Sequence, residues 1–231
     1  MSADLAFEKL DCVGVLTLNR PPHNFLDTLL LKDIADALDD ISSSSRCIVL
    51  RAAGRNFSAG RNFSEMRAIG DQPEDLYRQA ERLFNCNIPI VAEVRGAAIG
   101  AGFGLALVAD LRVGSPTTRF EAPFVKLGTR QGFAMTRTLA AVVGPQAARR
   151  MLLTGNVVYG NEALRCGLLD FLGKDAASAR DEAVIIAQAI AKYRPEAVST
   201  IRQSLRDETL DYSAVMIDEA NDQETLRDST P

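Results

Sequence analysis

The sequence predicts an α/β fold organised around a largely parallel sheet. Short β-branched runs at residues 47–52 and 90–94 alternate with helical patterns such as 27–41, where apolar residues recur at helical spacing. Strands that alternate with helices favour parallel pairing through right-handed crossovers. Four glycines follow the 90–94 run within nine residues, and they mark the stretch around which the rest of the chain is arranged.

The remaining elements follow from the same patterns, taken in chain order. Alternating apolar and polar residues at 5–10 and 12–18 predict two paired strands, and Asp27 is expected to be the N-cap of a helix that ends at Ile41. From residue 176 the composition changes to amphipathic helices and then to a frayed acidic tail. The other predicted strands and helices are 73–84, 105–108, 111–113, 133–143, 146–153, 179–193 and 195–205.

Composition excludes several classes of protein. A chain of 231 residues with 47% hydrophobic residues suits one globular domain, and a net charge of −4 leaves no basic footprint for nucleic acid or a membrane surface. The longest uncharged run, 96–109, is too short and glycine-rich to span a bilayer, and no secretory signal precedes it. We therefore expect a cytoplasmic protein with no nucleic-acid or membrane partner.

Cysteine and histidine usage argues against a metal centre. The four cysteines lack C-x-x-C spacing and three lie in apolar runs, which is typical of reduced thiols. His23 is the single histidine, so a structural zinc site is excluded and no metal is expected.

The glycine turn predicts a site for an anion or an oxyanion. Glycines let a backbone approach closely, and the first N–H groups of a helix have no internal partner. A tight turn that serves only packing is the other interpretation. A second stretch, 55–66, also follows a β-branched run and ends at a predicted helix start. Two such strand ends could polarise one carbonyl oxygen from two sides.

Together these stretches carry a family resemblance. The matching motifs follow one another over residues 5–172, and they are 19–24, 57–60, 88–92, 96–102, 105–106, 109–110, 119–128, 143–144, 152–155 and 162–170. In this order they resemble the enoyl-CoA hydratase/isomerase (crotonase) superfamily. The resemblance is specific for fold and thioester binding, and much less so for the reaction.

The resemblance implies a crotonase-like spiral of ββα units with a C-terminal helical trimerisation region. Residues 1–175 would form the core domain and 176–231 the helical region, shortened because the chain ends where relatives continue into a further helix. The implied partner is an acyl-CoA thioester, with coenzyme A entering as part of the substrate and no separate cofactor. The implied assembly is a homo-oligomer, either a trimer or a dimer of trimers.

The resemblance also assigns roles to particular positions. The backbone N–H groups of Arg61 and Ala101 would form a two-amide oxyanion hole. The positions implied for coenzyme A are His23, Phe25, Ser58, Ala59, Gly60, Arg61 and Gly100. The positions implied for the substrate pocket are Phe124, Arg130 and Phe133. The Arg61 side chain offers a permanent cation for a phosphate or carboxylate, or it is an ordinary surface arginine.

The acid/base residues depart from the family pattern. The two glutamates of typical hydratases correspond here to Gly104 and Phe124, neither of which can transfer a proton. Such groups each contribute about 10²–10⁴ in rate, so ordinary hydration is expected to be very slow. Glu121 is the candidate substitute acid/base, with an ion-paired or solvated carboxylate as the alternative. Glu93, inside a buried strand, is expected to pair with Arg95 at the sheet edge or at an interface rather than to act in catalysis.

Two functions from different classes remain. One is an acyl-CoA enzyme with non-standard proton transfer, such as an isomerase or a specialised hydratase or lyase. The other is a catalytically silent acyl-CoA-binding protein or an assembly partner of an active paralogue. Loss of both glutamates favours the second, whereas the retained glycine turn and Ala59-Gly60 favour the first. A dinucleotide site is excluded because Leu105 stands where a small residue is required, and a serine hydrolase lacks the G-x-S-x-G turn.

Overall fold

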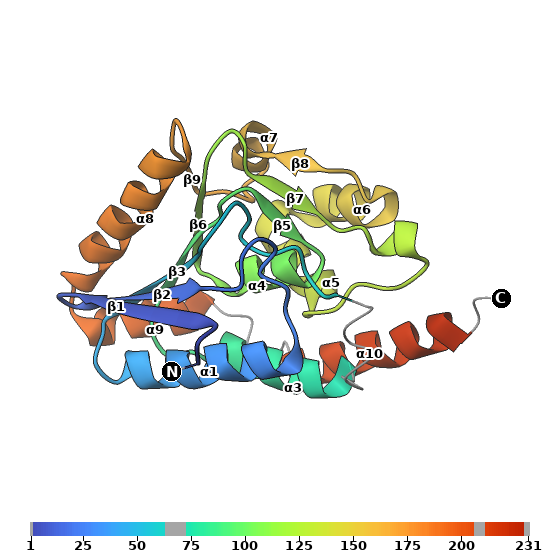
Figure 1. Cartoon of the computed structure of the whole chain (residues 1–231), viewed down its shortest axis with the longest axis horizontal. Helices are drawn as coiled ribbons and strands as arrows, with labels where there is room; N and C mark the ends of the chain where they lie inside the picture. Colours follow the sequence, from blue (N-terminus) through green and yellow to red (C-terminus); the bar gives the residue numbers. More distant parts are fainter. Residues whose placement is uncertain (1, 63–72, 206–210, 229–231) are drawn as a thin grey trace.

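The computed structural model describes residues 2–62, 73–205 and 211–228, and it contains two sheets surrounded by helices (Figure 1). The larger sheet has the order β1-β2-β3-β4-β6-β9 and the smaller one β5-β7-β8. The larger sheet consists of β1 (Leu5–Leu10), β2 (Val13–Leu18), β3 (Cys47–Ala52), β4 (Ile90–Glu93), β6 (Leu111–Gly114) and β9 (Phe171–Leu172). The smaller sheet consists of β5 (Ala97–Ile99), β7 (Arg119–Glu121) and β8 (Val158–Tyr159).

Strand pairing confirms the predicted, largely parallel arrangement. In the larger sheet β1 and β2 pair antiparallel, and each later pair of neighbours is parallel. The helices that connect and cover these strands are α1 (Thr28–Ser42), α3 (Pro73–Phe84), α4 (Ala101–Val108), η1 (Phe124–Leu127), α5 (Met135–Val143), α6 (Pro145–Thr154), α7 (Gly160–Arg165), α8 (Ala176–Ala191), α9 (Pro195–Leu205) and α10 (Tyr212–Asp228).

Each face of the larger sheet buries its own apolar cluster. Ile48 and Leu50 of β3 belong to the cluster that α1, α3 and α4 share, whereas Val49 belongs to the cluster beneath α8. Successive side chains of a strand point to opposite faces, so this alternation is the expected one. The α8 side of the contact consists of small residues four positions apart, namely Ala179, Ala183, Ala187 and Ala191. These alanines let the helix lie close to the sheet.

Two local predictions about helix starts meet different outcomes. The Asp27 carboxylate accepts a hydrogen bond from Leu30 N at 2.7 Å, which confirms the N-cap of α1. Helix α4 begins at Ala101, four residues before the predicted start at 105. The helix includes the glycines at 102 and 104, where close neighbours leave no space for side chains.

The prediction of a frayed acidic tail is wrong, because residues 212–228 form helix α10. This helix packs against α3 (Figure 1). The rings of Phe84 and Tyr212 stack with centroids 4.5 Å apart. Met216, Glu219 and Ala220 are buried on the inner face of α10. An apolar stripe of so few residues, set among acidic ones, gives little helical periodicity to detect.

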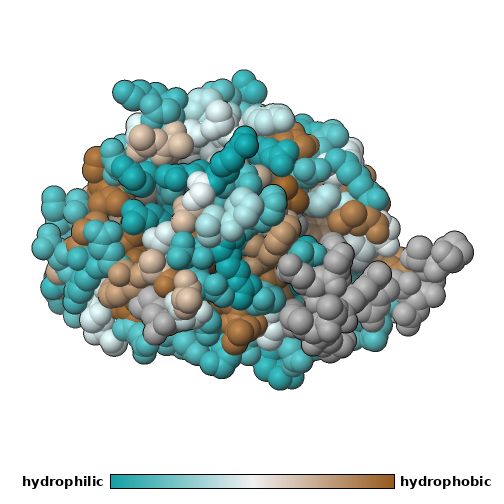
Figure 2. Space-filling model, viewed as in Figure 1, coloured by the Kyte–Doolittle hydropathy of each residue, from teal (hydrophilic) through white to brown (hydrophobic). Residues whose placement is uncertain are grey.

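The C-terminal helices differ in how much they bury. Helix α8 contributes to the core of the sheet, whereas α9, as far as it is described, has no buried residue and exposes Ile201 and Leu205. Figure 2 shows hydrophilic residues over much of the face in view, with apolar ones between them. The domain division at residue 175 and the trimer or dimer of trimers stay predictions. Within the described ranges, no helix is both long and apolar enough to cross a membrane.

Candidate functional site

Two segments that are far apart in the sequence run side by side at the centre of the site. Ser58 pairs in parallel with Ala98, and its N–H donates to Ala97 O at 3.0 Å while Ile99 N donates to Ser58 O at 3.0 Å. Helix α4 then begins directly against this pair, because a Cβ added at Gly102 would lie 2.4 Å from Ser58 O. The structure thus brings the two glycine-containing stretches together. Residues 63–66 of the upstream stretch lie outside the described residues.

Gly60 brings the first segment within reach of the α4 N-terminus. Its φ of +85° is a left-handed conformation, and a Cβ there would lie 2.6 Å from Ile99 O and 3.3 Å from Ala101 N. Gly100, which precedes the helix, also has a positive φ of +53°. Arg61 and Ala101, the next residue of each segment, both line one cavity.

The cavity has a volume of about 270 Å³. Its lining residues are Ala59, Gly60, Arg61, Tyr77, Ile99, Gly100, Ala101, Pro123, Phe124, Leu127, Thr129, Arg130, Gly132, Phe133 and Gln223. All three predicted substrate-pocket residues are among them, as are both predicted oxyanion-hole residues. In the part of the chain that the structure describes, this lining contains no Asp, Glu or His.

The other positions implied for coenzyme A, namely His23, Phe25 and Ser58, are not among the residues that line the cavity. His23 is exposed, with its ring centroid 5.0 Å from that of Phe25, and its carbonyl accepts a hydrogen bond from Ala59 N at 2.9 Å. Ser58 is fully buried, and its hydroxyl donates to Asn24 O at 2.7 Å and accepts from Gly60 N at 3.1 Å. Ser58 and His23 therefore fix the shape of the 57–60 segment.

Glu121 does not reach the cavity. Its carboxylate pairs with Lys126 Nζ at 3.1 Å, and its backbone carbonyl accepts from Gly100 N at 3.0 Å. The residue therefore shapes the glycine turn through its backbone, while its side chain forms the ion pair that was the alternative to a catalytic role.

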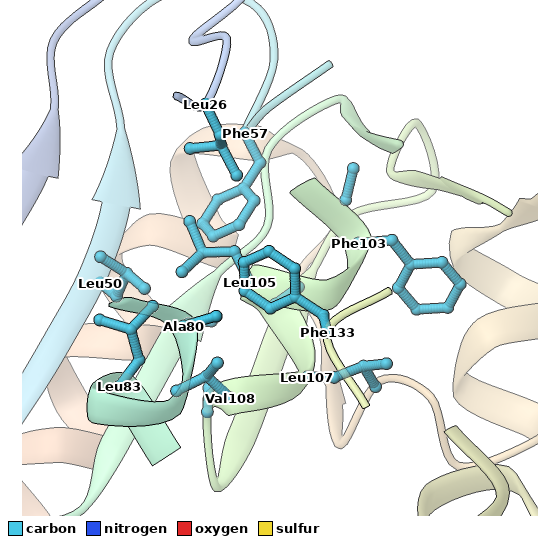
Figure 3. Close-up of a cluster of buried hydrophobic side chains, with 14 of the residues drawn as sticks. Leu26, Leu50, Phe57, Ala80, Leu83, Phe103, Leu105, Leu107, Val108 and Phe133 are labelled. Carbon is cyan, nitrogen blue, oxygen red and sulfur yellow. The ribbon is translucent and has the colours of Figure 1, made fainter. Parts of the chain in front are cut away.

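Phe133 fills the space beside Gly104. A Cβ added at Gly104 would lie 2.4 Å from the Cβ of Phe133, so no side chain fits there without movement of the phenylalanine. Phe133 is 1% exposed, and it and Ala134 adopt left-handed φ values of +63° and +50°. Figure 3 shows the Phe133 ring next to Leu105 in the buried cluster. The predicted helix at 133–143 begins only at Met135 because of this turn.

Glu219 of α10 holds this left-handed turn in place. Its carboxylate accepts hydrogen bonds from Ala134 N at 2.8 Å, Thr136 Oγ1 at 2.7 Å and Thr136 N at 3.3 Å. Burial raises the pKa of Glu219, while the hydrogen bonds from Thr136 and Ala134 act in the opposite direction. Through this residue the C-terminal helix fixes one wall of the cavity.

Tyr77 and Gln223 are cavity residues that the sequence analysis missed. The Tyr77 hydroxyl donates to Gln223 Oε1 at 3.0 Å, and burial raises the pKa of Tyr77 to about 12. Tyr77 lies on the apolar face of the predicted 73–84 helix, where it is indistinguishable from a core residue, and Gln223 lies in the predicted tail. Arg130, which the resemblance assigns to the substrate pocket, lines the cavity and pairs with Asp218 and Asp222.

Glu93 pairs with Arg95 as predicted, but not at the sheet edge. The carboxylate lies 3.4 Å from Arg95 Nε, and β4 lies between β3 and β6. Glu93 shares a face of β4 with Val91, which packs beneath α8. It is not among the residues that line the cavity.

This buried carboxylate predicts a pH-dependent stability. Burial raises the pKa of Glu93 from 4.5 to about 7, against the attraction of Arg95, Arg51 and Arg180. Below pH 4.5 the Glu93 carboxyl is protonated in both the folded and the unfolded state, so its contribution to the stability of the fold is fully present. As the pH rises through 7 this contribution is lost, because the carboxyl ionises more easily in the unfolded state than when it is buried. We expect this group to lower the free energy of unfolding by about 3 kcal/mol at most between pH 4.5 and 8.

Urea denaturation of the wild type and of Glu93→Gln at pH 5 and pH 8 measures this effect. Other titrating groups are common to both proteins, so the difference between their unfolding free energies isolates Glu93. We expect Glu93→Gln to gain stability relative to the wild type at the higher pH. An equal difference at both pH values would contradict the assignment.

Comparison with known proteins identifies the family. Residues 8–226 match the sequence model of the enoyl-CoA hydratase/isomerase family. The chain belongs to this family. A relative is the probable enoyl-CoA hydratase of Bacillus subtilis, 30% identical over 84% of this chain and 78% of its own. Another is the short-chain-enoyl-CoA hydratase of Clostridium acetobutylicum, 31% identical over 87% of this chain and 80% of its own.

A solved structure confirms the crotonase-like fold. The enoyl-CoA hydratase/isomerase from Pseudoalteromonas atlantica T6c is 28% identical, and the two chains superpose with a TM-score of 0.89 over 98% of this chain and 92% of the other. This family membership supports an acyl-CoA-processing role for the present chain. Among the described residues there is no cluster of three or more metal-ligating side chains.

Proposed function

We propose that this enoyl-CoA hydratase/isomerase family member processes acyl-CoA thioesters by binding the thioester oxygen between the N–H groups of Arg61 and Ala101. The observation that carries the proposal is the close approach of Gly60 to Ala101 N at the wall of the cavity. Two amides directed at one oxygen stabilise the negative charge that develops on it when the thioester becomes an enolate.

Ala101 suits this role because it is the first residue of α4. Its N–H has no acceptor within the helix, and within the described part of the chain no other acceptor is found for it. The positive end of the helix dipole adds to the attraction for an oxyanion. A backbone donor of this kind is also independent of the side chain, so it can persist where the acid/base side chains differ.

The acyl group would occupy the cavity between Phe124 and Phe133, whose rings supply apolar walls. Coenzyme A would then extend over Ala59 and Gly60 towards His23 and Phe25, with the Arg61 guanidinium as a donor to a phosphate. It would enter as part of the substrate, and no separate cofactor is proposed. By its family resemblance the protein would act as a trimer or a dimer of trimers, and by its composition it would act in the cytoplasm.

Proton transfer in this enzyme would not use the two carboxylates of typical hydratases. Glu121 would have to leave Lys126 to reach the cavity, and Gly104 and Phe124 offer no proton. The Tyr77 hydroxyl is engaged with Gln223 and burial raises its pKa to about 12, so a water molecule in the cavity would carry the proton. The favoured reactions are therefore slow hydration, double-bond isomerisation or a lyase reaction that starts from an enolate.

A catalytically silent acyl-CoA-binding protein is the second candidate. The observation that favours it is the absence of any carboxylate among the described residues that line the cavity. In this case the two amides would bind the thioester oxygen without subsequent chemistry, and an active paralogue would be the partner in assembly.

Turnover and binding measured on the same purified protein separate the two candidates. A panel of enoyl-CoA and aryl-CoA thioesters is incubated with the protein, products are separated by liquid chromatography, and affinities are measured by calorimetry. We expect at least one thioester to be converted with saturation kinetics. Binding of thioesters without any conversion would instead support the silent protein. If the protein neither binds nor converts any thioester, both candidates are refuted.

A further inference from the structure

One wall of the cavity carries an internal hydrogen-bonded pair that the proposed oxyanion chemistry does not use. Tyr77 from α3 and Gln223 from α10 both line the cavity, and the Tyr77 hydroxyl donates to Gln223 Oε1 at 3.0 Å. Gln223 Nε2 in turn donates to the Arg130 carbonyl at 2.8 Å. The carboxamide is therefore held in a fixed orientation between two partners.

The chain leaves space for the tyrosine hydroxyl. A Cβ added at Gly132 would lie 1.8 Å from Tyr77 Oη, so only glycine permits the hydroxyl to lie against the backbone at this point. Edge-to-face packing of the Tyr77 ring on Phe133, with centroids 6.4 Å apart at 87°, fixes the ring as well. The hydroxyl is thus positioned from two sides.

The remaining hydrogen-bonding capacity of the pair suits a hydroxyl group. Tyr77 uses its one O–H on Gln223, so its oxygen retains lone pairs that accept. Within the described residues Gln223 uses one hydrogen of its Nε2 on Arg130, and a second hydrogen is left to donate. A ligand hydroxyl can donate to the first and accept from the second. Burial raises the pKa of Tyr77 to about 12, so the phenol is neutral near pH 7.

We infer that Tyr77 and Gln223 form a specificity subsite for a hydroxyl group on the acyl chain beyond carbon 3, so that acyl-CoA thioesters with a 4- or 5-hydroxyl bind more tightly than unsubstituted ones. The inference rests on the proposed function, because it requires the acyl chain to enter this cavity. The remaining lining near the pair is largely apolar, with Phe133, Phe124 and Leu127 on the other walls. An alkyl chain would fit those walls but would leave the polar groups of the pair without a ligand partner.

Calorimetry with pentanoyl-CoA and with its 3-, 4- and 5-hydroxy derivatives tests the subsite. A hydroxyl at carbon 4 or 5 is not consumed by addition or elimination of water across carbons 2 and 3. Because a hydrogen bond formed in a protein contributes a modest net free energy, we expect the 4- or the 5-hydroxy derivative to bind about 3- to 10-fold more tightly than pentanoyl-CoA. In Tyr77→Phe this preference is expected to fall below about twofold, with affinity for pentanoyl-CoA retained.

Tyr193→Phe is the matched control, because it removes the same hydroxyl from a tyrosine that is 66% exposed and lies outside the cavity lining. It is expected to keep the wild-type preference. Gly132→Ala is a second variant, which drives a methyl group into the position of the Tyr77 hydroxyl and is expected to abolish the preference too. Thermal unfolding of each variant shows whether it is folded.

The outcomes distinguish this inference from the function beneath it. If the wild type binds pentanoyl-CoA and both the 4- and the 5-hydroxy derivatives with equal affinity, the subsite is overturned while acyl-CoA binding stands. A preference that survives in Tyr77→Phe overturns the assignment to this pair. Failure of every thioester to bind overturns the proposed function, and the subsite falls with it.

Discussion

Replacement of Ala101 by proline is expected to lower kcat/KM by about 10²–10³-fold for any thioester that the protein converts. Proline lacks the backbone N–H, so the substitution removes one of the two proposed oxyanion donors. Position 101 is the first residue of α4, where proline is well tolerated because its fixed φ suits the start of a helix. The loss should therefore fall on the chemistry rather than on the fold, and steady-state kinetics measures it.

Ala101→Ser is the control for this substitution, since it changes the side chain at the same position and keeps the amide. We expect it to retain activity within about threefold, as a small change at a half-buried helix start. Circular dichroism and thermal unfolding of both variants establish that α4 is intact. Equal activity of Ala101→Pro and Ala101→Ser would mean that the N–H of residue 101 does not contact the thioester oxygen.

Glu219→Ala is expected to lower the free energy of unfolding by about 3–5 kcal/mol, among the largest effects for one side chain. The substitution leaves the buried Ala134 N–H, the Thr136 N–H and the Thr136 hydroxyl without their acceptor. Each such donor is costly to bury unpaired, and hydrogen bonds to a charged acceptor are stronger than average. Chemical denaturation with urea gives the value directly.

Asp218→Ala is the neighbouring control on the same helix. Its carboxylate is 70% exposed and pairs with Arg130 at 3.2 Å, so its loss is expected to cost less than about 1 kcal/mol. A loss for Glu219→Ala as small as that for Asp218→Ala would show that the left-handed turn at Phe133 and Ala134 is held by other contacts.

Most of the sheet could be predicted because its strands are short, apolar and β-branched. Strand β3 has the predicted bounds, and the Asp27 cap marks the start of α1, since both signals are local in the sequence. The glycine turn and the Ala59-Gly60 segment predicted where two chain segments would meet for the same reason. Glycine is the residue that lets two backbones approach closely, so its position in the sequence marks such a contact directly.

The cavity wall formed by Tyr77 and Gln223 could not be predicted, because its meaning depends on contacts between distant segments. Tyr77 occurs in a helix whose apolar face looks like any core-facing stripe. Gln223 belongs to α10, whose periodicity is masked by acidic residues, so its approach to Tyr77 across 146 positions leaves no local trace. The left-handed turn at Phe133 and Ala134 could not be predicted from the sequence either, because neither residue type favours that conformation.

Because Gly104 contacts Phe133, a proton-transfer side chain can be introduced at position 104 only together with a change at position 133. A glutamate placed at 104 alone would collide with a ring whose backbone is tethered by the C-terminal helix. Phe133 must first be replaced by a smaller residue, which opens the space that a carboxylate side chain at position 104 needs. Steric overlap therefore sets the order of the two substitutions, and a glutamate at position 104 alone cannot supply the acid/base group of a typical hydratase.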